Sequence, residues 1–262
     1  MEQDTVARDS AVVEPATSIR IPRIDHWFYI GVGIFVVLLS IVGFAPSVVS
    51  PTSRTVPLPF TLPVALHALF GSAWVLLFLF QAFLVATRRT NLHRRVGVTG
   101  AVIAVAFGIT GCWMFVQHAA RGFDLSGDLM PGGSPVAPEV ALVPVTQVVL
   151  FGILVGAAIW YRHRPPIHKR LMLLATSGVM TGAPIAHIVG HWPVLQPIAA
   201  SVAGTLAVVL LLPSAIYDRV TMGRVHPVSL WGAVFVFSFN VVFFIGVPSI
   251  SAWRDFAVWL VT

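Results

Sequence analysis

Histidine is the residue type best placed for chemistry in this sequence, which contains nine. His67 and His187 lie inside long apolar segments, each about 10 Å from the segment's midplane at a rise of 1.5 Å per residue. His118 ends a third apolar segment at a similar level, and His191 follows His187 by one helical turn. Neutral imidazole ligates zinc, copper and iron. The set predicts a site for b-type haem or a transition-metal ion, with His67 and His187 as ligands and His118 and His191 in reserve.

A metal ion, as opposed to haem, would use His67, His187 and His191. Arg121 lies just beyond His118 and would neutralise a haem propionate or an anionic substrate. Pro184, three residues before His187, frees the backbone carbonyl of Met180, and helix breaks of this kind often mark binding sites in membrane proteins.

Two further histidines are each followed in the sequence by two basic residues. Two trios each begin an apolar segment, where they act as topology signals and contact lipid headgroups. The functional alternative is a second histidine ligand pair, or an anion site suited to a quinone or a haem propionate. The trios are His93, Arg94, Arg95 and His168, Lys169, Arg170.

Composition places this chemistry in a membrane. Of 262 residues, 57% are hydrophobic and 10% are charged, with a mean hydropathy of +0.88. Soluble domains carry about 25% charged residues. The net charge of +6 comes from short basic clusters between apolar runs, which excludes a nucleic-acid partner. We find no acidic residue within the apolar segments, so the sequence predicts imidazole as the only titratable group inside the bilayer.

Two rare residue types exclude other chemistries. Cys112 is the only cysteine, so the chain forms no internal disulfide and no cysteine-based metal site. Lys169 is the only lysine and begins a segment, so a retinal Schiff base deep in a helix is excluded.

The apolar segments predict an all-α integral membrane protein with seven transmembrane helices. Residues 1–26 form a polar cytoplasmic tail, and residues 27–262 form the membrane domain. Basic residues gather in alternate loops, so the positive-inside rule places the N-terminus in the cytoplasm and the C-terminus outside. The expected spans are Trp27–Pro46, Leu62–Thr87, Val96–Gln117, Leu142–Tyr161, Leu171–Gly190, Ile198–Tyr217 and Leu230–Val247.

Several stretches of spans two to seven resemble families of uncharacterised bacterial multipass inner-membrane proteins that share an HRR-x-G helix entry. The resemblance implies a compact helical bundle in a bacterial inner membrane, and no established reaction. Its positions map onto His67, His93, His168 and His226, whereas His187 and His191 depart from it. The stretches are Leu66–Ala68 with Trp74, Gln81 and Leu84; Asn91–Gly97; Arg164-Pro165 with His168–Ala175; and Gly223–Pro227.

The preferred hypothesis is electron transfer or redox chemistry near the outer leaflet, with a redox protein or a quinone as partner. The alternative is a non-enzymatic transporter, sensor or assembly factor whose histidines are structural. A hydrolase or hydroxylase that uses Glu139 or Asp128 of the outer loop ranks last.

Overall fold

The computed structural model describes residues 23–49, 61–122, 136–190 and 212–262, in which the regular elements are all helices, joined by turns, without a strand. Six helices in this part of the chain are long and apolar enough to cross a membrane. The described part of the chain is therefore all-helical, with the long apolar helices of a multipass membrane protein, as the composition predicted. The six candidate spans are Trp27–Ala45, Leu62–Ala86, Thr90–Arg121, Pro138–Trp160, Pro165–Ile188 and Pro227–Ser249.

The first three helices are α1 (Arg23–Val49), α2 (Leu62–Ala86) and α3 (Thr90–Arg121). A tight turn joins α2 to α3, and Arg88 occupies the left-handed region there with φ of 62°. Helix α3 begins six residues earlier than predicted, so His93 lies in its first turn and not before it. It ends at Gly122, whose φ of 69° suits a glycine at a helix terminus.

The next stretch contains α4 (Pro138–Ala141), α5 (Val145–Trp160), α6 (Pro165–Leu173) and α7 (Gly182–Gly190). A π-helical segment, η3 (Leu174–Val179), follows α6 directly. The fifth predicted span is therefore not one regular helix. It breaks at Met180 and Thr181 because Pro184 lacks the N–H that would bond the carbonyl of Met180.

The last helices are α9 (Leu212–Met222), α10 (Pro227–Val241) and α11 (Ser251–Val261), with a π-turn η5 (Val242–Gly246) and a 3₁₀ turn η6 (Val247–Ser249) after α10. The predicted sixth span, Ile198–Tyr217, lies mostly outside the described residues, and only its end falls in α9. Helix α11 was not predicted. Its Trp253 Nε1 donates to the carbonyl of Glu139 at 2.7 Å, and Arg254 pairs with the Glu139 carboxylate at 3.8 Å.

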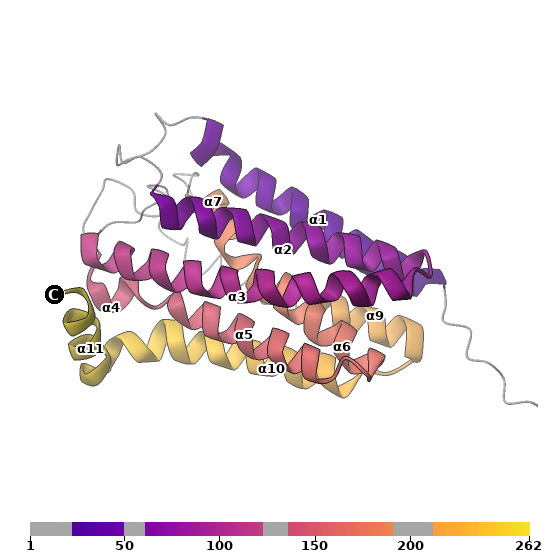
Figure 1. Ribbon diagram of the computed structural model, residues 1–262. Helices are drawn as coiled ribbons and strands as arrows, with labels where there is room; N and C mark the ends of the chain where they lie inside the picture. The colour runs from indigo at the N-terminus through magenta and orange to yellow at the C-terminus, as the bar shows by residue number, and fades with distance from the viewer. Residues whose placement is uncertain (1–22, 50–60, 123–135, 191–211) are drawn as a thin grey trace, which may run out of the picture.

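The helices lie roughly side by side (Figure 1), and the basic residues of the sequence gather at one end of them. The α2–α3 turn, the α5–α6 turn and the α9–α10 loop lie at the same end of the bundle as the start of α1. We call this the basic end, and the opposite end comprises the end of α3 together with α4 and α11. Between them, Trp74, Phe107 and Phe151 centre the apolar core. The basic end carries Arg88, Arg89, Arg94, Arg95, Arg162, Arg164, Lys169, Arg170, Arg219 and Arg224.

Candidate functional site

Two histidines from different helices face each other at the basic end. The ring centroids of His93 on α3 and His168 on α6 are 6.4 Å apart, and the ring planes are inclined at 85°. The Nδ1 of His168 lies 2.8 Å from the carbonyl of Ala158 on α5. Because a carbonyl only accepts, Nδ1 donates this hydrogen bond and Nε2 faces away from it. A ring fixed through one nitrogen in this way is the usual arrangement of a metal-ligating histidine.

Gln81 of α2 completes this cluster with unsatisfied polar atoms. Both side-chain amide atoms of Gln81 are buried and have no hydrogen-bond partner among the described residues, whereas the His93 ring interacts with the backbone carbonyl of Gln81. A Cβ at Gly97 would lie 3.9 Å from Nε2 of Gln81, so the glycine of the HRR-x-G stretch faces this amide. Buried polar atoms without partners cost free energy. The cluster of His93, His168 and Gln81 therefore has the character of a ligand site.

The other four residues of the predicted basic site do not gather with these histidines. Arg94 and Arg95 are exposed on the first turns of α3. The ammonium of Lys169 lies over the rings of Tyr29 and Tyr217. Arg170 is buried in an ion pair. The structure thus brings together the histidine pair of the predicted site, while its cations have separate surroundings.

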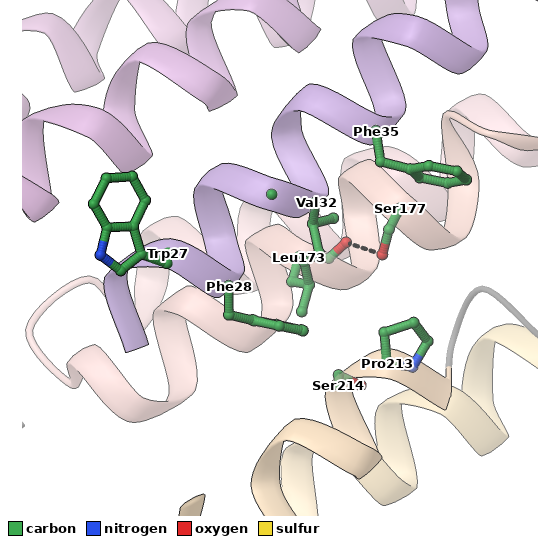
Figure 2. A pocket seen from close by; sticks show the side chains of 9 residues that line it. Trp27, Phe28, Val32, Phe35, Leu173, Ser177, Pro213 and Ser214 are labelled. Atoms are coloured by element: carbon green, nitrogen blue, oxygen red, sulfur yellow. Dashed lines mark hydrogen bonds between the residues drawn. The ribbon is translucent and has the colours of Figure 1, made fainter. Parts of the chain in front are cut away.

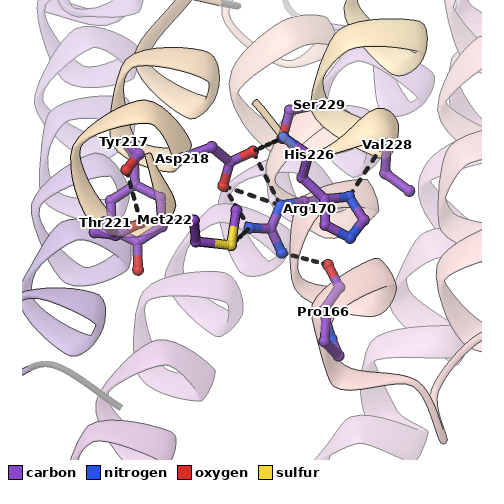
Figure 3. A network of polar contacts seen from close by, with 9 residues as sticks. All are labelled: Pro166, Arg170, Tyr217, Asp218, Thr221, Met222, His226, Val228 and Ser229. Atoms are coloured by element: carbon purple, nitrogen blue, oxygen red, sulfur yellow. Dashed lines mark hydrogen bonds and ion pairs between the residues drawn. The ribbon is translucent and has the colours of Figure 1, made fainter. Parts of the chain in front are cut away.

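The ion pair joins Arg170 of α6 to Asp218 of α9 (Figure 3). The Nε of Arg170 donates to both carboxylate oxygens at 3.1 and 3.2 Å, a terminal nitrogen donates to the same carboxylate, and the other donates to the carbonyl of Pro166 at 2.7 Å. Asp218 is 0% exposed and Arg170 is 2% exposed. Asp218 is therefore a buried acid immediately after the predicted sixth span, and its burial was not predicted from the sequence.

Asp218 also accepts from the start of α10. Ser229 Oγ donates to its carboxylate at 2.5 Å, and the backbone N–H of His226 donates at 3.1 Å. Burial by itself would raise the pKa of Asp218. The hydrogen bonds from Arg170 and Ser229, the charge of Arg170 and the His226 N–H together hold that pKa below its ordinary value. A single acid inside a basic loop was the sequence signal for this pair.

The Gly223–Pro227 stretch has a structural explanation. Gly223 takes a φ of 69° after α9, and Pro227 begins α10, where its missing N–H costs nothing. His226 caps α10, because its Nδ1 accepts from the N–H of Val228 at 3.1 Å. Burial, followed by the positive charge of Arg170, lowers the pKa of His226 despite the opposing effect of Asp218. Its capping nitrogen must stay unprotonated, so the neutral form suits this role.

The predicted outer histidines contact aromatic rings. His67 stacks on Phe107 with a centroid separation of 4.2 Å and a plane angle of 21°, and its Nδ1 lies 3.3 Å from the Phe107 carbonyl. His187 on α7 is buried and packs edge-on against Phe44 of α1 at 4.8 Å. His67 thus faces α3, whereas His187 faces α1.

The remaining residues of the predicted outer site have different surroundings. His118 is buried near the end of α3, and Arg121 is exposed one turn later, where its positive charge suits the negative end of the helix dipole. His191 lies outside the described residues. Within the part of the chain that the structure describes, no group of three or more histidine, cysteine, aspartate or glutamate side chains is arranged to hold a metal ion.

Comparison with known proteins adds no relative: no family model, no curated protein and no solved structure matches the chain.

Proposed function

We propose that the protein binds a transition metal, as a bare ion or as haem iron, between His93 and His168, and that it uses this metal in electron transfer or redox chemistry. The facing rings of the two histidines carry the proposal. Metal–nitrogen bonds of about 2 Å bring two ligand nitrogens on one metal within about 4 Å of each other. Ring centroids lie farther apart than the ligand nitrogens, so the separation of 6.4 Å is compatible with one metal between the two rings.

The donor set favours an open metal site. Two imidazoles and one neutral amide supply no negative charge, and imidazole suits zinc, copper, iron and nickel. Structural zinc sites are closed by four protein ligands. A site with His93, His168 and the amide oxygen of Gln81 would leave positions for a substrate or a redox partner. The carbonyl of Ala158 holds the His168 ring in place for this role.

The finer topology is also a proposal. We place seven spans in a bacterial inner membrane, with the N-terminus in the cytoplasm and the C-terminus outside. The gathering of basic residues at one end supports this orientation, because the opposite end carries Arg121 and Arg254 in the described residues. The metal site would then lie near the cytoplasmic surface, and not near the outer leaflet as the sequence suggested.

The test is metal and haem analysis of the purified full chain in detergent, combined with a reduced-minus-oxidised spectrum. We expect about one metal per chain in the natural protein. His93→Ala and His168→Ala should each lose it. The matched control is His163→Ala, because His163 is an exposed histidine in the neighbouring α5–α6 turn and should retain it.

Variants of the outer histidines test whether the metal binds at the predicted outer site instead. If His67→Ala and His187→Ala lose the metal while His93→Ala and His168→Ala keep it, the ligands are the outer histidines, with His118 and His191 as candidates for the rest. A natural protein without metal or haem, whether as purified or after incubation with Cu²⁺, Zn²⁺ and haem, contradicts both placements.

The structural roles of two other histidines favour one alternative function. His226 is a helix cap and His67 stacks on Phe107, so these two already have structural roles. If the pair His93 and His168 is also structural, the protein is a non-enzymatic transporter, sensor or assembly factor. Solute uptake in proteoliposomes, or a co-purifying partner, together with the absence of metal, would favour that function.

A further inference from the structure

Helix α11 lies where three of the candidate spans begin or end. It starts at Ser251, directly after the last span, Pro227–Ser249. It packs against α4, where the span Pro138–Trp160 begins, and against α3, whose span ends at Arg121. Figure 1 shows α11 beside α4, at the end of the bundle opposite the basic end. Its 11 residues make it about 16 Å long, which is too short to cross the hydrocarbon core of a bilayer.

One face of α11 packs against the protein. Ala257 is 0% exposed and belongs to a buried cluster with Ala119 of α3. Trp253, one turn earlier, packs against this cluster, and its Nε1 donates to the carbonyl of Glu139 on α4. Val261, one turn later, packs against it too. Because residues four apart share a face of a helix, these contacts hold α11 in one orientation on α3 and α4.

The exposed surface of α11 is apolar on one side and polar on the other. Ala252, Phe256 and Trp259 follow an i, i+4, i+7 spacing and share a face, which we call the apolar strip. Phe256 is 44% exposed and Trp259 is 70% exposed, and their ring centroids lie 6.0 Å apart. The apolar strip therefore presents two adjacent rings to its surroundings. The polar side contains Ser251, Arg254, Asp255 and Thr262, with Val258 among them.

Exposed tryptophans also mark the ends of other spans. Trp27, which lines the cavity shown in Figure 2, is 70% exposed at the beginning of α1. Trp160 at the end of α5 and Trp231 near the beginning of α10 are exposed as well, and all three lie toward the basic end. Tryptophan is enriched where a membrane meets water, because its ring is apolar and its N–H is polar. Trp259 places the same residue type, equally exposed, at the opposite end.

We propose that α11 binds the lipid bilayer at its interface with water and lies in the plane of the membrane. The apolar strip contacts the acyl chains, and the polar side faces water. Exposed apolar residues run along the last span through Phe244 and Ile245 to Ile250, directly before α11, so the lipid that surrounds this span also reaches the helix. Amphipathic helices with Trp and Phe on one face bind membranes in this way. The proposal does not depend on a metal at His93 and His168.

Quenching of a fluorescent label tests the proposal in the full chain, reconstituted in phosphatidylcholine vesicles. Cys112 is the only cysteine, so Cys112→Ser provides a background for single labels. We expect a bimane label at Phe256→Cys to be quenched by lipid that carries a spin label near its headgroup, and to be protected from aqueous iodide. Asp255→Cys is the matched control, because Asp255 is the preceding residue, is exposed and lies on the polar side. Its label should show the opposite pattern.

Two results overturn the proposal. If iodide quenches the label at residue 256 as strongly as the label at residue 255, the apolar strip faces water. If neither quencher reaches the label at residue 256, a second copy of the chain or another protein covers the strip.

Trp259→Phe keeps the proposal testable if the labelled variants do not fold. The emission that this variant loses relative to the natural protein belongs to Trp259. Lipids brominated near the headgroup should quench that emission in the natural protein, because the Trp259 ring lies among them. Quenching of the same emission by iodide and not by brominated lipid would contradict the proposal.

Discussion

The two ends of the bundle use the same residue types in different ways. At the basic end, polar side chains reach across helices to one another: His168 faces His93, and Arg170 pairs with Asp218. Toward the opposite end, two histidines pack against aromatic rings: His67 stacks on Phe107, whose carbonyl lies 3.3 Å from its Nδ1, and His187 lies against Phe44. An intramembrane histidine therefore does not by itself indicate a ligand, because its neighbours decide between packing and chemistry.

The largest expected effect concerns the ion pair at the basic end. Asp218→Ala leaves the buried guanidinium of Arg170 without its carboxylate, and breaking a buried pair in this way costs about 3–5 kcal/mol. Thermal unfolding in detergent measures the loss. The control is Asp255→Ala, because Asp255 is exposed on α11 and its removal should be nearly neutral.

A double variant sharpens the same comparison. Arg170→Leu with Asp218→Leu removes both charges and should recover most of the stability that Asp218→Ala loses, since an apolar pair can replace a buried ion pair. If Asp218→Ala is as stable as the natural protein, the ion pair does not hold α6 to α9.

The close approach of α1 and α7 should show the next largest effect. A Cβ at Gly43 would lie 2.6 Å from atoms of Pro184, including its backbone carbonyl oxygen, so the helices must move apart. Overpacking of this kind costs about 1–3 kcal/mol. We expect Gly43→Ala to lower the unfolding midpoint, whereas Gly31→Ala, with no atom within 4 Å of its Cβ, should not. Equal midpoints for the two variants would contradict the packing at Gly43.

Variants of His67 distinguish a packing role from a ligand role at the opposite end. His67→Phe should keep the stack on Phe107 and nearly all of the stability, and His67→Ala should lose about 1 kcal/mol, the usual worth of an aromatic pair. His93→Phe should instead lose the bound metal. Loss of metal from His67→Phe in the same metal analysis would reverse the assignment of the two ends.

The smallest expected effect is the dependence of stability on pH. The pKa of His226 is lowered from 6.5 and that of Asp218 from 3.8, so the unfolded chain binds more protons than the folded one in acid. The stability from His226 is present above pH 6.5 and is lost as the pH falls toward its lower folded value. The contribution of Asp218 is lost below pH 3.8.

Unfolding midpoints recorded from pH 8 downward measure this dependence. His226→Asn is the matched control, because asparagine can still cap α10 but does not titrate. Its midpoint should fall less than that of the natural protein between pH 7 and pH 5. An identical decline in both proteins would show that His226 is not the group responsible.

Six of the seven predicted spans overlap candidate spans of the structure, because a run of apolar residues is a local signal, and the remaining one, Ile198–Tyr217, lies mostly outside the described residues. The sequence offers the pair of His93 and His168 as an alternative site. Preferring this pair to His67 and His187 requires the structure, in which α3 and α6 bring the two rings together. The ion pair of Asp218 could not be predicted from the sequence, because its partner, Arg170, lies 48 residues away. A single acid among basic residues does not by itself indicate a buried pair. Helix α11 was missed because it is too short and too polar for a span.

The π-helical segment Leu174–Val179 accommodates one extra residue without changing the rotational phase of the helix that follows it. Each residue of an α-helix turns the chain by about 100°, and a π-helix widens that turn by one residue. Deletion of a single residue here would let α6 continue as an α-helix, and loss of the wider turn would compensate for the lost residue. His187 would then still face Phe44, and His168, Lys169 and Arg170 would keep their partners. One residue can thus be gained or lost at this point without altering which faces of the two halves of the span meet their neighbours.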